Sequence, residues 1–153
     1  ELQAVLSRND AAMVVAMLDL DHFKKLNDQY GHLVGDNCLT YVGELMKRKF
    51  DRRSDIVARF GGEEFIIALP ETEQNGVTLV ANRILKNVEA LNIEHVGSPN
   101  QRVTVSAGYS VTKATASASL ESIINLADLA LFEAKQSGRN TVCGFENFEA
   151  AFK

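Results

Sequence analysis

The hydrophobic and polar positions along the chain predict an alternating series of strands and helices. Residues 11–20 (AAMVVAMLDL) form an almost continuous apolar run, which is typical of a central strand covered on at least one face. Two shorter strand patterns, 55–60 and 64–69, are joined by Gly61-Gly62, a sequence that favours a hairpin. Amphipathic periodicity and alternation indicate the remaining elements. Helices are expected over 1–8, 34–50, 73–91 and 120–136, and strands over 102–111 and 141–145.

From the first strand onward, the order is strand, helix, strand, strand, helix, strand, followed by one more helix and strand. This is the order of an α+β fold with a ferredoxin-like βαββαβ core, in which helices cover one face of the sheet. The first and third strands of such a core are antiparallel neighbours. Because no repeat, low-complexity segment or linker interrupts the sequence, we expect residues 1–153 to form a single domain.

Three carboxylates are expected to meet at one edge of this sheet. Asp19 stands near the end of the first strand, whereas Glu63 and Glu64 stand at the beginning of the third. Neighbouring carboxylates repel one another unless protons or cations compensate. Mg²⁺ is a suitable cation, because it is usually held by one or two carboxylates while water and substrate phosphates complete its shell. The pattern is equally compatible with acids that only solvate a sheet edge.

Cationic groups near the same edge would suit a phosphorylated ligand. After the first strand the chain passes through Phe23 and Lys24 into a short helix, which offers backbone N–H groups and a lysine. Lys135 and Arg139 stand at the end of another helix and offer two more cations. The alternative for Lys135 and Arg139 is that they only complement the dipole of that helix.

Composition narrows the class of protein. Of the 153 residues, 46% are hydrophobic and 24% are charged, which is typical of a globular domain. The net charge of −4 disfavours nucleic acid or an anionic membrane as a partner. No apolar run approaches the ~20 residues of a membrane helix, and no signal-peptide pattern is present. Cys38 and Cys143 lie far apart and in no metal-binding spacing, so we expect reduced thiols and a cytoplasmic location.

Four segments resemble a known family. They are DLDHFKKLNDQYGHLVGD (19–36), RRSDIVARFGGEEF (52–65), VSAG (105–108) and ADLALFEAKQSGRN (127–140). In this order and spacing they resemble the GGDEF family of diguanylate cyclases, with Gly-Gly-Glu-Glu-Phe as a variant of its signature. The resemblance implies a fold related to nucleotidyl cyclases and polymerase palm domains. It also implies that the family's leading segment would stand before Glu1, so that this chain is a truncated form of the domain.

The resemblance implies metal and catalytic roles for residues at the sheet edge. Asp19, the carbonyl group of Leu20 and Glu63 match metal ligands, and Glu64 matches a further ligand. The implied metal is Mg²⁺, with Mn²⁺ as an alternative. Glu63 also matches the catalytic base. Lys24 matches the lysine that stabilises charge on the phosphates during transfer.

The resemblance also implies a set of residues that contact the substrate. Asn27 and Asp36 match the positions that hydrogen-bond the guanine edge. The remaining contacts implied are His32 and Phe23 in the same pocket, and Lys135 and Arg139 at the triphosphate.

The implied function is the condensation of two GTP molecules into cyclic di-GMP with release of pyrophosphate. Metal ions would neutralise the triphosphate and lower the pKa of the attacking ribose 3′-hydroxyl. Each domain would hold one GTP, so catalysis would require an antiparallel homodimer. The resemblance implies a bacterial cytoplasmic domain, with any membrane anchor upstream of it.

A second ligand site is implied by an Arg-x-x-Asp pattern. Arg52 and Asp55 precede Gly61 at the spacing of the family's inhibitory product site, and Arg83 matches its secondary arginine. Arginine forks pair with phosphates and stack on guanine faces. Cyclic di-GMP is therefore expected as an inhibitor as well as a product. The alternative is an ordinary charged turn before a strand.

Two other functions are compatible with this fold. A non-catalytic module could sense GTP or cyclic di-GMP and regulate an attached domain, but intact Gly61-Gly62 and the acids after them favour catalysis. An enzyme that makes an adenine-containing cyclic dinucleotide is disfavoured by Asp36, which suits guanine. Ala107 departs from the family's larger aliphatic residue, a difference that we expect to affect only packing.

Overall fold

The computed structural model describes residues 12–70, 74–113 and 119–145. The predicted elements agree with the observed ones to within a few residues, and the helix expected over 1–8 lies outside the described part. In chain order the elements are β1 (Ala12–Leu20), α2 (Phe23–Tyr30), α3 (His32–Lys49), β2 (Ile56–Arg59), β3 (Glu64–Pro70), α4 (Gln74–Ala90), β4 (Val105–Lys113), α5 (Leu120–Gln136) and β5 (Val142–Phe145).

The strands form one five-stranded sheet in the order β2-β3-β1-β4-β5. The central strand β1 is antiparallel to both β3 and β4, whereas β5 pairs in parallel with β4. This register places Asp19 of β1 opposite Glu64 on one side and Ser106 on the other. The predicted α+β, ferredoxin-like order is confirmed, including the antiparallel pairing of the first and third strands.

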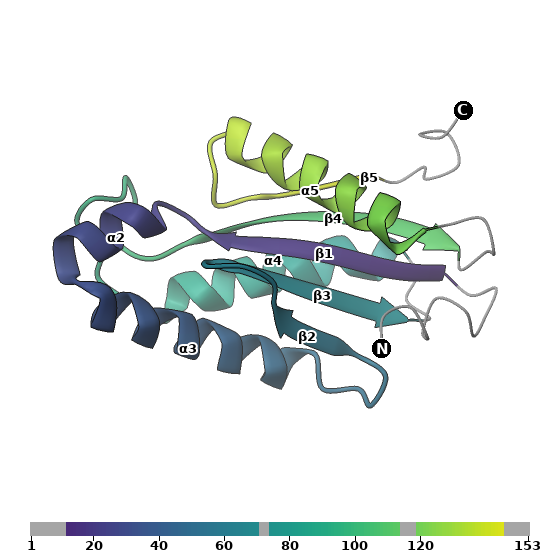
Figure 1. The fold of residues 1–153 in the computed structure, drawn as a ribbon, viewed down its shortest axis with the longest axis horizontal. Coiled ribbons are helices and arrows are strands. Elements are labelled where there is room, and N and C mark those ends of the chain that lie inside the picture. Colours follow the sequence, from purple (N-terminus) through teal and green to yellow (C-terminus); the bar gives the residue numbers. More distant parts are fainter. Residues whose placement is uncertain (1–11, 71–73, 114–118, 146–153) are drawn as a thin grey trace.

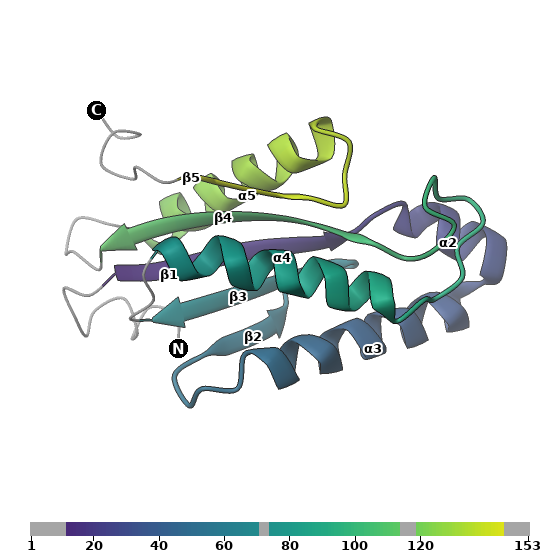
Figure 2. The same ribbon diagram turned by 180° about the vertical axis from the view of Figure 1, so that it is seen from behind.

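Helices cover both faces of the sheet (Figures 1 and 2). On one face, Val14 and Leu18 of β1 pack in a core shared with α3 and α4. On the other face, Met13 and Met17 pack with Ala127 of α5. Because successive residues of a strand point to opposite faces, both sets of alternating side chains in β1 are apolar up to Leu18, which explains the nearly continuous hydrophobic run. The prediction that helices cover a single face of the sheet is correct for the βαββαβ core. The appended helix α5 covers the opposite face.

Close packing of α5 leaves no room for a side chain at one position of β4. A Cβ atom built on Gly108 would lie 2.0 Å from the backbone N of Leu131 and 2.5 Å from the carbonyl O of Ala127. Glycine is therefore required there by the approach of the helix backbone, and it fixes how closely α5 lies against the sheet.

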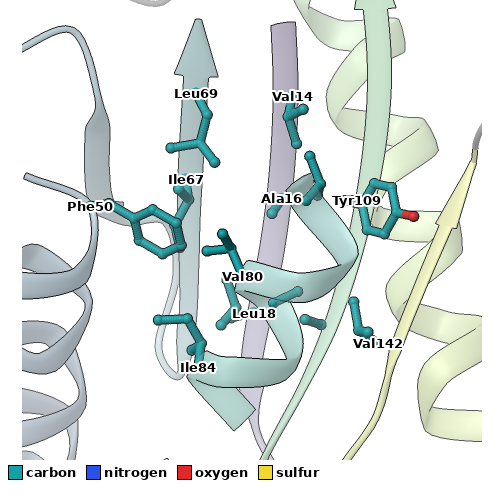
Figure 3. A pocket seen from close by; sticks show the side chains of 13 residues that line it. Val14, Ala16, Leu18, Phe50, Ile67, Leu69, Val80, Ile84, Tyr109 and Val142 are labelled. Carbon is teal, nitrogen blue, oxygen red and sulfur yellow. The ribbon is translucent and has the colours of Figure 1, made fainter. Parts of the chain in front are cut away.

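An apolar cavity of about 30 Å³ remains between the sheet and α4 (Figure 3). Its walls include Leu18, Ile67, Ile84 and Tyr109, together with the small side chain of Ala107. We expect the cavity to be dry, because a water molecule there would lack the polar partners that it needs. The site residues predicted from the sequence do not line it.

Two predictions about the whole chain can be compared with the described residues. Cys38 and Cys143 are free thiols, and burial raises the pKa of Cys38 to about 11. None of the helices in the described ranges is long and apolar enough to cross a bilayer.

Candidate active site

The end of β1 and the β2–β3 hairpin bring the three predicted carboxylates to one edge of the sheet. Asp19 lies opposite Glu64, and the N–H of Leu20 donates a hydrogen bond to the carbonyl O of Glu63 at 3.4 Å. Asp19 is only 3% exposed, whereas Glu63 and Glu64 are half-buried. The juxtaposition predicted from strand order is confirmed.

Asp19 is electrostatically the most perturbed group at this edge. Burial raises its pKa from 3.8 to about 6, and the charges of Glu63 and Glu64 add to the rise, while an ion pair with Lys135 opposes it. Lys135 donates to Oδ2 of Asp19, but Oδ1 is buried without a hydrogen-bond partner in the described part of the chain. An unsatisfied buried acceptor costs about 1–3 kcal/mol, and a bound cation would remove this cost.

The donor atoms at this edge fit a hard cation. Among the described residues, no three His, Cys, Asp or Glu side chains are grouped so that they could hold a metal by themselves. Mg²⁺ does not require such a group, because one or two carboxylates suffice when water and phosphates fill the other positions. The unpartnered Oδ1 of Asp19 is the feature that such an ion would satisfy.

The N-terminus of α2 lies directly after this carboxylate. His22 precedes the helix in a left-handed conformation, with φ 55°, and no described side chain caps the first turn. Uncapped N–H groups and the positive end of the helix dipole favour an anion. Lys24 is exposed in the same turn. The pKa of His22 is lowered first by burial and next by the positive charge of Arg139. Arg139 therefore contributes positive potential at this end of α2.

A left-handed turn between α5 and β5 positions Arg139. Gly138, Arg139 and Asn140 have φ values of 105°, 65° and 46°. The N–H of Arg139 donates to the carbonyl of Ala134 at 3.1 Å, and that of Asn140 donates to Oδ2 of Asp21 at 3.0 Å. Left-handed backbone costs a non-glycine residue about 1–2 kcal/mol. The turn therefore depends on its tertiary anchor at Asp21.

Asp21 was not a predicted site residue, but it organises the site. It is 4% exposed and accepts hydrogen bonds from Thr104 Oγ1 at 2.7 Å, Ser106 Oγ at 2.6 Å and the N–H of Asn140 at 3.0 Å. These donors satisfy a carboxylate that burial would otherwise destabilise. The sequence carries no local signal for this role, because the partners lie 83, 85 and 119 residues away.

The predicted guanine contacts lie at the junction of α2 and α3. Asn27 is half-buried in α2, and its Oδ1 has no hydrogen-bond partner within the described ranges. A Cβ atom on Gly35 of α3 would lie only 1.8 Å from that oxygen, so the two helices meet here. Asp36 and His32 are exposed in the first turns of α3. Phe23, which is also predicted to lie beside the guanine, is buried.

Two of the three predicted product-site residues, Arg52 and Asp55, lie in the turn between α3 and β2. Arg52 donates from Nε and from its backbone N–H to the carboxylate of Asp55 at 3.0 and 3.1 Å, and from Nη2 to the carbonyl of Pro70 at 3.1 Å. The Asp55 side chain is 3% exposed and that of Arg52 is 50% exposed. This turn lies at the opposite end of β2 from the Gly61-Gly62 hairpin (Figure 1). Arg83 is exposed on α4.

Fold and site together define an α+β domain with a buried carboxylate–lysine pair beside a helix terminus suited to phosphate. The sequence profile described as "Diguanylate cyclase, GGDEF domain" matches residues 1–141, and the chain belongs to this family.

Curated relatives include several diguanylate cyclases. The chain is 43% identical over 128 residues to diguanylate cyclase A of Treponema denticola, covering 84% of this chain and 34% of that protein. It is 39% identical over 134 residues to diguanylate cyclase DgcP of Pseudomonas aeruginosa, covering 87% of this chain and 19% of that protein. The chain thus spans about a third or less of the length of these relatives.

Solved structures of the same family share the fold. The GGDEF domain of DgcB from Caulobacter crescentus in complex with c-di-GMP has a TM-score of 0.82 at 30% identity, covering 93% of this chain and 82% of that one. The active GGEEF domain of a diguanylate cyclase from Vibrio cholerae has a TM-score of 0.75 at 30% identity, covering 89% and 84%.

Proposed function

We propose that this domain condenses two GTP molecules into cyclic di-GMP and releases pyrophosphate. The observation that carries the proposal is the buried Asp19, whose Oδ1 lacks a partner in the described part of the chain and whose Oδ2 binds Lys135, beside the uncapped N-terminus of α2. Family membership and the similarity to diguanylate cyclases support the same reaction.

Asp19, the carbonyl of Leu20 and Glu63 would hold Mg²⁺ or Mn²⁺, with Glu64 as a further ligand. The ion would neutralise the triphosphate and lower the pKa of the ribose 3′-hydroxyl. Glu63 is half-buried at the hairpin and would accept the proton of that hydroxyl. The hydroxyl oxygen would attack the α-phosphorus of the second GTP, and the bond from that phosphorus to pyrophosphate would break. The 3′-hydroxyl of the second nucleotide would then attack the α-phosphorus of the first in the same way, which closes the ring and releases a second pyrophosphate.

The cations of the chain would bind the phosphates. Lys24, Arg139 and the first N–H groups of α2 would contact the triphosphate, because they surround the end of β1. Lys135 is bound to Asp19 in this structure. We infer that Lys135 moves to a phosphate when a metal ion binds Asp19, because the two neighbouring cations would repel each other. Catalysis would then consist largely of positioning and charge stabilisation.

The hairpin glycines support a ligand at this edge. A Cβ atom on Gly62 would meet nothing within 4 Å in the described structure, and one on Gly61 would meet only the side chain of Glu64, at 3.5 Å. Neither glycine has a left-handed φ. The isolated fold therefore requires glycine at neither position, whereas a nucleotide that passes close to the hairpin backbone would.

Guanine would be selected at the junction of α2 and α3. The amide of Asn27 and the carboxylate of Asp36 would pair with the guanine edge, with His32 and Phe23 beside the base. A carboxylate accepts from guanine N1–H and the exocyclic amine, whereas adenine has no donor at N1. The unpaired polar group costs about 1–3 kcal/mol, so ATP should be a poor substrate.

Two copies of the chain would be needed for one reaction. Each would hold one GTP, and a two-fold axis would bring the two nucleotides together in an antiparallel homodimer. Cyclic di-GMP would also bind at Arg52, Asp55 and Arg83 and inhibit the enzyme. Because GTP is supplied inside the cell, this proposal places the domain in the cytoplasm.

The test is to incubate the purified chain with GTP and Mg²⁺ and to measure cyclic di-GMP and pyrophosphate. We expect both products, a rate per chain that rises with protein concentration, and loss of activity in Asp19→Asn and in EDTA. ATP in place of GTP is the specificity control. If GTP binds but neither product forms, the chain is a sensing module and the proposed reaction is wrong.

A further inference from the structure

A buried histidine outside the assigned site contacts the backbone at the start of α2. His95 is 0% exposed in the loop 91–104 between α4 and β4, and its Nε2 lies 3.0 Å from the carbonyl O of His22. A carbonyl oxygen only accepts, so Nε2 carries the proton and donates. The two imidazole rings meet edge to face, with centroids 6.5 Å apart. The contact joins residues 73 positions apart.

The carbonyl group that His95 contacts begins α2. It also accepts the N–H of Leu26 at 3.1 Å, which is the first hydrogen bond of that helix. His22 itself is in a left-handed conformation, which costs a non-glycine residue about 1–2 kcal/mol. The donor on His95 therefore stabilises a strained peptide whose orientation sets the direction of the first N–H groups of α2.

The same loop contacts the other end of α2. The hydroxyl of Tyr30 donates to Glu94 at 3.2 Å and accepts the N–H of Val96 at 3.1 Å. A Cβ atom on Gly97 would lie 2.7 Å from Oε1 of Gln29, so the loop lies against this end of the helix. Both ribbon views show the loop alongside α2 (Figures 1 and 2).

The loop is itself braced by backbone hydrogen bonds. The N–H of His95 donates to the carbonyl of Gln101, and the N–H of Ser98 donates to the carbonyl of His95, both at 3.1 Å. Further along, Thr104 binds Asp21 through its side chain and its carbonyl. Thr104 and His95 of this loop therefore hold residues 21 and 22 in place. The hydrogen bonds within the loop fix His95 itself.

We propose that His95 is a positioning residue for the phosphate-binding end of α2. Its Nε2–H fixes the His22 carbonyl, and through it the helix terminus that carries Lys24 in its first turn and Asn27 one turn later. This role rests on the proposed function, because it orients the groups that would bind GTP. His95 would touch neither nucleotide nor metal.

A matched pair of substitutions separates the hydrogen bond from simple packing. His95→Gln keeps an N–H donor near the position of Nε2, whereas His95→Met has similar length and no donor. We expect His95→Met to lower kcat/KM for GTP by about tenfold to a hundredfold, mostly through kcat, because a small misplacement of bound phosphates slows transfer. His95→Gln should stay within about threefold of wild type. If His95→Met does not fold, retained turnover in His95→Gln supports the role and a tenfold loss there overturns it.

Amide hydrogen exchange gives a readout that does not depend on activity. We expect the amides of residues 23–27 to exchange about tenfold faster in His95→Met than in His95→Gln, while the amides of β1 and β3 stay unchanged. Equal kinetics and equal exchange in the two variants would overturn the inference. If wild type makes no cyclic di-GMP, the proposed reaction fails, and the exchange data alone decide the role of His95.

Discussion

Two aspartates at the end of β1 differ in what surrounds them. Both are almost fully buried, with 3% exposure for Asp19 and 4% for Asp21. Asp21 is supplied with two hydroxyl donors and a backbone N–H. Asp19 has one lysine partner and an oxygen that is unpaired within the described ranges. At the residue scale, Asp21 is therefore satisfied by the fold, whereas Asp19 remains available to a ligand.

The raised pKa of Asp19 gives a pH-dependent prediction for the metal-free chain. Its folded pKa is about 6 and its ordinary value is 3.8, so folding favours the neutral carboxyl. The stability that Asp19 contributes is fully present below about pH 3.8 and is lost as the pH rises through about 6. In EDTA, Asp19→Asn should therefore gain about 1–3 kcal/mol relative to wild type between pH 4 and pH 7.5, as measured by urea denaturation.

Asp21→Asn is the matched control for that measurement. It replaces an acceptor of three hydrogen bonds and should lower the free energy of unfolding by about 2 kcal/mol at neutral pH. Addition of Mg²⁺ should raise the melting temperature of wild type more than that of Asp19→Asn. A constant difference between wild type and Asp19→Asn across the pH range would contradict the environment described for Asp19.

At the scale of elements, a glycine in the first turns of α3 sets the position of Asn27. Helix propensity alone predicts that Gly35→Ala is stabilising by about 1 kcal/mol. The new Cβ would, however, lie 1.8 Å from Oδ1 and 2.9 Å from Cγ of Asn27, so the amide must move. We expect affinity for a non-hydrolysable GTP analogue to fall by at least about tenfold in calorimetry.

Gly43→Ala provides the control for that experiment on the same helix. Its Cβ would meet only the ring of Phe65, at 3.3 and 3.7 Å, away from the proposed guanine pocket. Nucleotide affinity should remain within about twofold of wild type. Wild-type affinity in Gly35→Ala would show that Asn27 does not contact the base.

The packing of β4 under α4 gives a stability prediction. Ala107 lines the apolar cavity, so Ala107→Val would place two more methyl groups in empty space. We expect a gain of about 1 kcal/mol in the free energy of unfolding, with activity unchanged. In contrast, Ala127→Val on α5, which is 0% exposed against the sheet, should cost about 1–3 kcal/mol through overpacking. A loss of stability in Ala107→Val would mean that the cavity cannot accept the added groups.

At the scale of the whole molecule, the proposed active site and product site lie at opposite ends of β2. Arg52 is expected to bind the product, and it also hydrogen-bonds Asp55 and the carbonyl of Pro70 near its own turn. A substitution of Arg52 therefore affects both ligand binding and the turn. We expect Arg52→Ala to weaken cyclic di-GMP binding by at least about tenfold in calorimetry and to relieve product inhibition, with the initial rate nearly unchanged. Arg53→Ala, in the same exposed turn, is the control and should behave as wild type. Equal affinities in Arg52→Ala and wild type would mean that this segment is an ordinary charged turn and not a product site.

Much of the fold follows from the sequence, because local patterns encode it. The apolar run over β1 indicated a strand covered on at least one face, and helical spacing located α3, α4 and α5. Strand order then placed Asp19 beside Glu64, since antiparallel neighbours bring opposite ends together. The guanine contacts and the product site were implied by motif resemblance alone, which carries the spacing of side chains along the chain but not their contacts.

Tertiary structure alone decided which polar groups are paired. Lys135, for which the sequence predicts a phosphate contact, binds Asp19 across 116 residues in this structure. His95 gave no sequence signal, yet it is buried on the carbonyl of His22. Such contacts depend on how the loop 91–104 and the end of α5 pack around β1, and no local periodicity records this. Burial then determines their strength, because a polar group removed from water must find its partner within the fold.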